Sequence, residues 1–139
     1  MGFTHTLAKG AGLAMAGAAF ALLVSATPAS AQADVAKEVS TAAQHAGFAA
    51  QAKDLKGAQM HLHHVINCLV GPKGKGFDAA QLNPCKDQGN GAIPDTTDAA
   101  KKKSLRTALA KARAGLRAKK LETAQRDATA AENALKGAM

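Results

Sequence analysis

The segment HLHHVINC places three histidines and one cysteine within eight residues, from His61 to Cys68. The whole chain contains five histidines and two cysteines, so much of its metal-ligating chemistry is concentrated here. Imidazole nitrogens and cysteine thiolates are both ligands of first-row transition metals. The segment therefore has three interpretations: a metal site, a haem ligand, or the polar flank of a helix whose cysteine forms a disulfide.

Helical spacing separates these side chains into two groups. At 100° per residue, His61, His64 and Cys68 form a stripe beside the apolar face, and His63 lies on the opposite edge. Residues three apart on a helix approach closely enough for two imidazoles to share an ion. His45 and His61 stand at similar distances before and after a predicted turn, which gives them similar heights in an antiparallel hairpin. We therefore predict a divalent-metal cluster of His61, His64 and His45, with His63 as a further candidate and copper, nickel or zinc as the ion.

The same histidines also fit a purely structural role, as side chains at the edge of the core with a solvated tip. A non-covalent haem with a histidine or Met60 as axial ligand is disfavoured, because alanine-rich helices supply little apolar volume for it. The chain has no CxxCH or CxxC motif, no glycine loop that follows a strand and no pair of catalytic carboxylates. We therefore expect a binding protein and not an enzyme.

The two cysteines, Cys68 and Cys85, are predicted to form one disulfide, since an even number of cysteines in an exported chain usually pairs. The bond would close a loop of about 17 residues and stabilise the fold by about 3 kcal/mol. A free Cys68 thiolate that binds metal and an intermolecular disulfide remain the alternatives.

The first 31 residues have the layout of a secretory signal peptide. Lys9 precedes an apolar run, and Ala29-Ser30-Ala31 forms a small-residue cleavage site. The run is shorter than the roughly 20 residues that span a bilayer. We expect cleavage after Ala31, a periplasmic or secreted location, a single domain over residues 32–139 and no integral membrane segment.

An internal repeat predicts the fold. Thr41–Gly71 aligns with Thr107–Gly137 at a shift of 66 residues, with 11 identities in 31 positions. In both copies, apolar residues recur at i, i+3, i+7, i+10 and i+14 from Leu55 and from Leu121, and another helical pattern lies upstream. Two helical hairpins predict an all-α four-helix bundle. The expected bounds are about 34–70 for hairpin 1, 71–95 for a long disulfide-tied loop and 96–137 for hairpin 2.

Helix-end signals agree with these bounds. Gly71 and Gly137 each stand just past the last apolar position, where glycine commonly follows a helix. Thr96, Thr97 and Asp98 offer N-caps for the third long helix.

The charge is concentrated in the second hairpin. Residues 32–100 carry 6 Lys and 7 Asp or Glu, a net charge of −1, whereas residues 101–139 carry 11 Lys or Arg and 3 Asp or Glu, a net charge of +8. This is typical of a solvated basic face, or of docking on an anionic partner or membrane surface. The signal peptide and the scarcity of stacking aromatics argue against nucleic acid. A structural or stress-related protein without a ligand is the remaining alternative.

The blocks HLHHVINCLVGPKGKGFD and NPCKDQGNGAIPD resemble an uncharacterised group of small exported bacterial helical proteins, over roughly Ala46 to Asp95. The paired alanine-rich hairpins are also similar to the small metal-binding protein family, periplasmic four-helix bundles that take up divalent metals such as copper. That family spreads histidines along all its helices, whereas the mature chain here has four, all in hairpin 1. The resemblance therefore implies one specific site, at His45, His61 and His64.

Overall fold

The computed structural model describes residues 1–2 and 33–139, and this part of the chain is all-helical, without a strand. The predicted signal peptide lies almost entirely outside the described residues. No helix in the described part is long and apolar enough to cross a membrane. The helices are α1 (Val35–Ala50), α2 (Leu55–Val70), α3 (Ala92–Asp95), α4 (Ala99–Leu116) and α5 (Leu121–Lys136).

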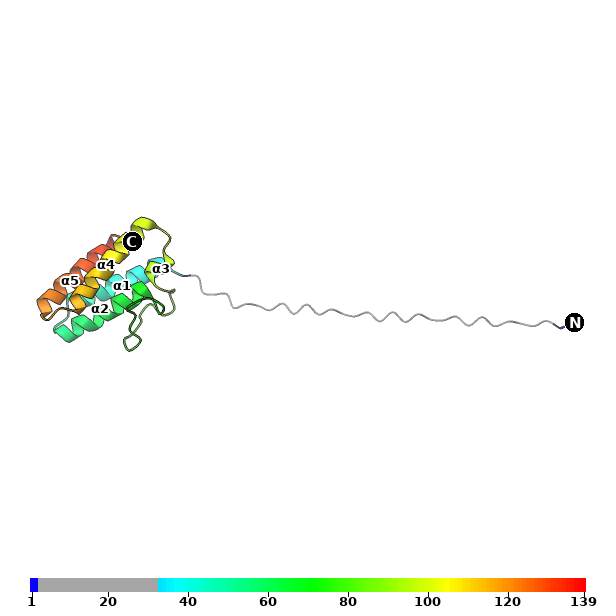
Figure 1. Ribbon diagram of the computed structural model, residues 1–139, viewed down its shortest axis with the longest axis horizontal. Coiled ribbons are helices and arrows are strands. Elements are labelled where there is room, and N and C mark those ends of the chain that lie inside the picture. The colour runs from blue at the N-terminus through cyan, green and yellow to red at the C-terminus, as the bar shows by residue number, and fades with distance from the viewer. Residues whose placement is uncertain (3–32) are drawn as a thin grey trace.

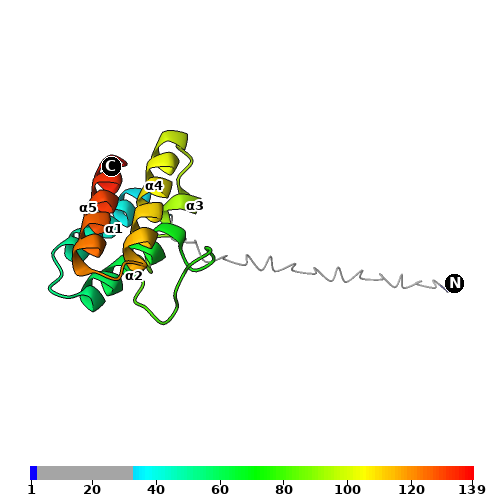
Figure 2. The same cartoon turned by 60° about the vertical axis from the view of Figure 1, so that its left-hand side comes forward.

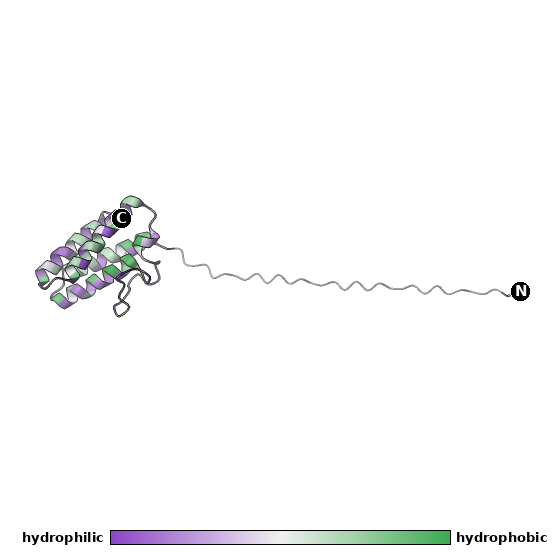
Figure 3. Ribbon diagram, in the orientation of Figure 1, coloured by the Kyte–Doolittle hydropathy of each residue, from purple (hydrophilic) through white to green (hydrophobic). Residues whose placement is uncertain are grey.

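The four long helices lie side by side and form a closed ring of contacts (Figures 1 and 2). α1 packs against α2 and α5, and α4 packs against the same two helices. Hydrophilic and hydrophobic residues alternate along each helix (Figure 3), as expected when one face is buried. The core consists of many alanines around a few larger side chains that are fully buried, including Leu62, Leu69, Leu105 and Leu135. Small side chains let the helices approach closely.

Aspartates begin three of the four long helices. Asp34, Asp54 and Asp98 are the N-caps of α1, α2 and α4, and each carboxylate accepts the backbone N–H three residues later. The predicted cap at Asp98 is therefore confirmed. Gly71 ends α2 with a φ of 67°, in the region that favours glycine. Gly137 follows α5 with a φ of −69°, so that position does not require glycine.

The predicted disulfide between Cys68 and Cys85 is present and ties the long loop to the end of α2. Figures 1 and 2 show that this loop lies beside α2. Its base is closed by two glycines, Gly71 and Gly91, the latter with a φ of 115°. A Cβ on Gly71 would lie 1.5 Å from the carbonyl oxygen of Asn90, so the backbones can meet only without side chains. The segment predicted as loop over 71–95 is not irregular throughout, because its last four residues form α3.

Two buried polar side chains hold this loop to the helices. Asn67 is fully buried on α2; its amide donates to the carbonyls of Asp78 and Leu82, and its Oδ1 accepts the Asp78 N–H. Glu38 is fully buried on α1, and its Oε1 accepts the Gly91 N–H at 2.9 Å. These bonds from helix side chains supplement the turns within the loop, and they satisfy the N–H groups of Asp78 and Gly91, which have no other partner there.

Two glutamines link the hairpins reciprocally. The Gln59 amide donates to the carbonyl of Ala118 at 3.1 Å, and the Gln125 amide donates to the carbonyl of Ala52 at 3.0 Å. Each residue of the first bond stands 66 positions from its counterpart in the second. Both bonds cap the carbonyl of a residue in a helix–helix turn, where it has no helical partner.

Candidate metal centre

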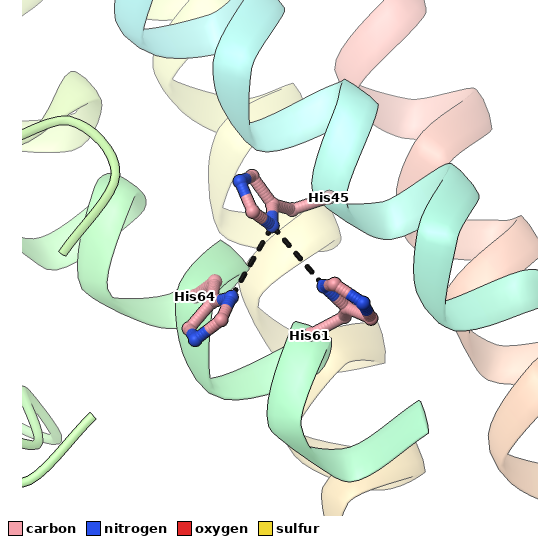
Figure 4. Close-up of side chains that lie close together, drawn as sticks. All are labelled: His45, His61 and His64. Atoms are coloured by element: carbon pink, nitrogen blue, oxygen red, sulfur yellow. Dashed lines mark hydrogen bonds between the residues drawn. The ribbon is translucent and has the colours of Figure 1, made fainter. Parts of the chain in front are cut away.

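Three histidines meet between α1 and α2. His45 comes from the middle of α1, and His61 and His64 come from successive turns of α2 (Figure 4). The turn between Ala50 and Leu55 is short, so the two helices run antiparallel and pack closely. This places His45 opposite the His61–His64 pair, as the equal heights in the hairpin predicted.

The Nδ1 atoms of these side chains converge. His45 Nδ1 lies 3.3 Å from His61 Nδ1 and 3.3 Å from His64 Nδ1. Ligand atoms of all three side chains lie within 4.8 Å of one another. The dashed lines in Figure 4 meet at the ring of His45, which therefore occupies the centre of the group. We call His45, His61 and His64 the histidine cluster; its members are close enough to bind one metal ion.

Hydrogen bonds alone cannot give every Nδ1 atom of the cluster a partner. A neutral imidazole has at Nδ1 either one proton or one in-plane lone pair. His45 Nδ1 therefore forms one good hydrogen bond at a time, although two nitrogens lie equally near it. A cation between the rings would use the lone pairs of all three nitrogens at once.

The environment keeps the cluster neutral. Burial, followed by the charges of His64 and His61, lowers the pKa of His45 to about 4. Burial also lowers the pKa of His61, and burial together with the neighbouring histidines lowers the pKa of His64. Neutral imidazole is the metal-binding form, so near pH 7 all three side chains are in the state that a metal requires.

Phe48 forms an aromatic wall on one side of the histidine cluster. Its ring centroid lies 5.5 Å from that of His45, edge to face, and 5.3 Å from that of His61. Phe48 is 45% exposed although it is a large apolar residue. Such a wall limits the access of water to two of the imidazoles. The only sequence signal for this role is the position of Phe48 at i+3 from His45, the spacing of a helical neighbour.

Two other predicted candidates lie outside the cluster. His63 points to a different contact, with Nδ1 3.5 Å from the Asp78 carboxylate. The alternative of Cys68 as a thiolate ligand is wrong, because its sulfur is bonded to Cys85. Hairpin 2 carries Lys111, Asp127 and Ala130 at the positions 66 residues after the three histidines. Hairpin 1 alone therefore supplies these ligands.

A comparison with known proteins finds no family model, curated protein or solved structure that matches this chain.

Proposed function

We propose that this protein binds one divalent transition-metal ion through His45, His61 and His64. The observation that carries the proposal is the convergence of three neutral imidazoles from two helices. In tetrahedral coordination with metal–nitrogen bonds of about 2.0–2.1 Å, adjacent nitrogens are about 3.3 Å apart. The two His45 distances, both 3.3 Å, match this value, and the ligand atoms of His61 and His64 lie within 4.8 Å of each other.

We propose zinc as the ion, with copper and nickel as competitors. Imidazole ligands suit all three, and a tetrahedral spacing is typical of zinc. Three protein ligands leave a fourth position for water or for a ligand from a partner. The cluster contains no carboxylate to act as a general base, so we infer binding or transfer of the ion and not hydrolysis.

We further infer that the protein works outside the cytoplasm. The signal-peptide layout of the first 31 residues supports export, and the Cys68–Cys85 disulfide suits an oxidising compartment. The closed ring of four long helices and the reciprocal Gln59 and Gln125 bonds support a four-helix bundle built from a duplicated hairpin. The resemblance to the periplasmic small metal-binding protein family points to the same function.

Native mass spectrometry of the full chain, purified from the exported fraction, tests these points together. The mass reports the cleavage site, the loss of two hydrogens in the disulfide and any bound ion. We expect one zinc ion per chain after zinc is offered and free ion is removed. A protein that takes up zinc, copper and nickel only in variable, non-stoichiometric amounts would contradict a defined site.

The matched pair His61→Ala and His63→Ala locates the site. Both side chains are half-buried neighbours on α2, but only His61 belongs to the histidine cluster. In a titration against a zinc chelator, we expect His61→Ala to weaken binding at least about 100-fold, since each ligand bond contributes several kcal/mol. His63→Ala should stay within about threefold of the unsubstituted chain. Equal losses in the two variants would place the ion elsewhere.

A further inference from the structure

A concave site lies between α3, α4 and the segment after α2. Its cavity volume is about 630 Å³. Small-molecule sites commonly enclose about 300–1,000 Å³. We call it the basic pocket, after the positively charged residues that line it: Lys73, Lys75, Lys102, Arg106 and Arg113.

The basic pocket carries an uncompensated positive charge. No carboxylate lines it, and its five cationic side chains form no ion pair with any carboxylate in residues 33–139. Lys102, Arg106 and Arg113 follow one face of α4, at i, i+4 and i+11. Lys73 and Lys75 face them from the loop. A concave site lined by charges of one sign attracts ligands of the opposite sign.

The remaining walls of the pocket are largely apolar. They are formed by Val70, Ile93, Pro94 and Leu109. Val70 is the last residue of α2, Ile93 and Pro94 belong to α3, and Leu109 lies on the same face of α4 as the cations. A bare inorganic anion would leave this apolar surface uncovered. A ligand with an apolar body as well as an anionic group would use both kinds of wall.

One cation also fixes the shape of the pocket. Arg113 Nη2 donates to the carbonyl oxygen of Lys75 at 2.6 Å and so holds the loop wall against α4. The guanidinium has five N–H donors, so further donors remain for a ligand anion. The disulfide and the close backbone approach of Gly71 and Gly91 hold the same loop at further points. The pocket is therefore built by tertiary contacts and is not a mere gap between flexible side chains.

From these features we propose that the basic pocket binds a small amphipathic anion, a phosphate- or carboxylate-headed molecule with an acyl-like body. The head lies among Lys102, Arg106 and Arg113, and the apolar body covers Ile93 and Leu109. This site is separate from the histidine cluster, so neither proposal depends on the other.

Isothermal titration calorimetry of the full exported chain tests this with three probes below their aggregation concentrations. These are decyl phosphate, decanol as a neutral body, and inorganic phosphate as a head alone. We expect one molecule of decyl phosphate per chain, bound at least about tenfold more tightly than either fragment. Equal affinity for inorganic phosphate or for decanol would overturn the proposal, because the pocket would then recognise only half of the ligand.

Two double variants of α4 with identical charge changes locate the binding. Lys102→Gln/Arg106→Gln changes the pocket, and Lys103→Gln/Lys111→Gln changes exposed cations of the same helix that do not line it. We expect the first to weaken decyl phosphate binding at least about tenfold and the second less than threefold. Equal weakening would overturn the pocket in favour of a general attraction to the basic hairpin. Anionic vesicles are a further probe. The proposal would also be overturned if both variants bound the vesicles equally well and decyl phosphate did not bind at all. Circular dichroism melts establish that both variants are folded.

Discussion

His45 Nδ1 and His64 Nδ1 lie 3.3 Å apart across the α1–α2 interface, although 19 residues separate them in the chain. Because His45 is on α1 and both His61 and His64 are on α2, an ion bound by the cluster would cross-link the two helices. An ion held by all three side chains would bind the folded arrangement more tightly than the unfolded chain, and it would therefore stabilise the fold. The proposed site would therefore couple metal binding to the stability of hairpin 1.

The first expected outcome is a zinc-dependent rise in thermal stability. At a free zinc concentration about 100 times the Kd, the free energy of unfolding should increase by about 2.7 kcal/mol. Differential scanning calorimetry with and without a chelator measures this difference. The rise should persist in His63→Ala and disappear in His61→Ala. A stabilisation that survives in His61→Ala would show that zinc acts elsewhere.

The histidine cluster also makes the metal-free protein sensitive to acid. The pKa of His45 falls from 6.5 to about 4 in the fold, so between these values the unfolded chain binds more protons than the native state. The contribution of His45 to the free energy of unfolding is therefore fully present above pH 6.5 and is lost as the pH falls toward 4. In His45→Gln, urea denaturation should show a loss over this window that is smaller by about 1–2 kcal/mol. An identical pH dependence would contradict the lowered pKa.

Glu38 should act in the opposite direction. Burial, opposed by the Gly91 hydrogen bond and assisted by the charges of Asp95 and Asp34, raises the pKa of this carboxyl from 4.5 to about 7. Its Oε2 is buried without a hydrogen-bond partner, consistent with a side chain that holds a proton. Between pH 4.5 and 7 the native state binds more protons at Glu38 than the unfolded chain does, so the contribution of this residue to stability falls as the pH rises through the window.

Glu38→Gln removes that titration while keeping an oxygen that can accept the Gly91 N–H. We expect this variant to be about 1–3 kcal/mol more stable than the unsubstituted chain at pH 8 and to differ little at pH 4.5. Urea denaturation at the two pH values measures the difference. Since Glu38 and His45 have overlapping windows, the His45→Gln comparison is best made in the Glu38→Gln background. A variant whose stability difference from the unsubstituted chain is the same at both pH values would show that the pKa of Glu38 is not raised in the fold.

Asn67 and Asn133 provide a matched pair from the two hairpins. They are equivalent in the repeat, but Asn67 is fully buried and binds the loop backbone, whereas Asn133 is exposed. Asn67→Ala leaves the Asp78 N–H without its partner and should cost about 2–4 kcal/mol of unfolding free energy. Asn133→Ala should change it by less than about 0.5 kcal/mol. Similar costs for both would contradict the role of Asn67 in holding the loop.

The disulfide should support the loop and leave the metal ligands in place. Cys68→Ser/Cys85→Ser removes the link, and we expect a loss of about 2–4 kcal/mol of stability. The ligands are on α1 and α2, which contact each other directly along their length, so zinc affinity should change by less than about threefold. The comparison needs conditions in which the variant stays folded, which circular dichroism establishes. A large loss of affinity in the folded variant would mean that the loop also positions His64.

The helices of this protein follow from local sequence. The apolar spacing that predicts α1 and α2 is confirmed by the burial of Val39, Ala42, Leu62 and Leu69. The histidine cluster could be predicted for the same reason. Helical periodicity sets the direction of each side chain, and a short turn sets the relative height of two antiparallel helices. Together these fix where His45 stands relative to His61.

The path of the long loop was decided only by the tertiary structure. Composition showed that residues 71–95 contain turn formers, but not that their end forms α3 or that they lie over Glu38 and Asn67. Nothing in the sequence around Glu38 distinguishes this residue from an ordinary solvated residue in the first turn of a helix. Its burial arises because Gly91, 53 residues away, folds over it.

The basic pocket likewise forms only where this loop meets α4. Periodicity within a helix is a local property that sequence carries directly, whereas the closure of a long loop depends on contacts between distant residues.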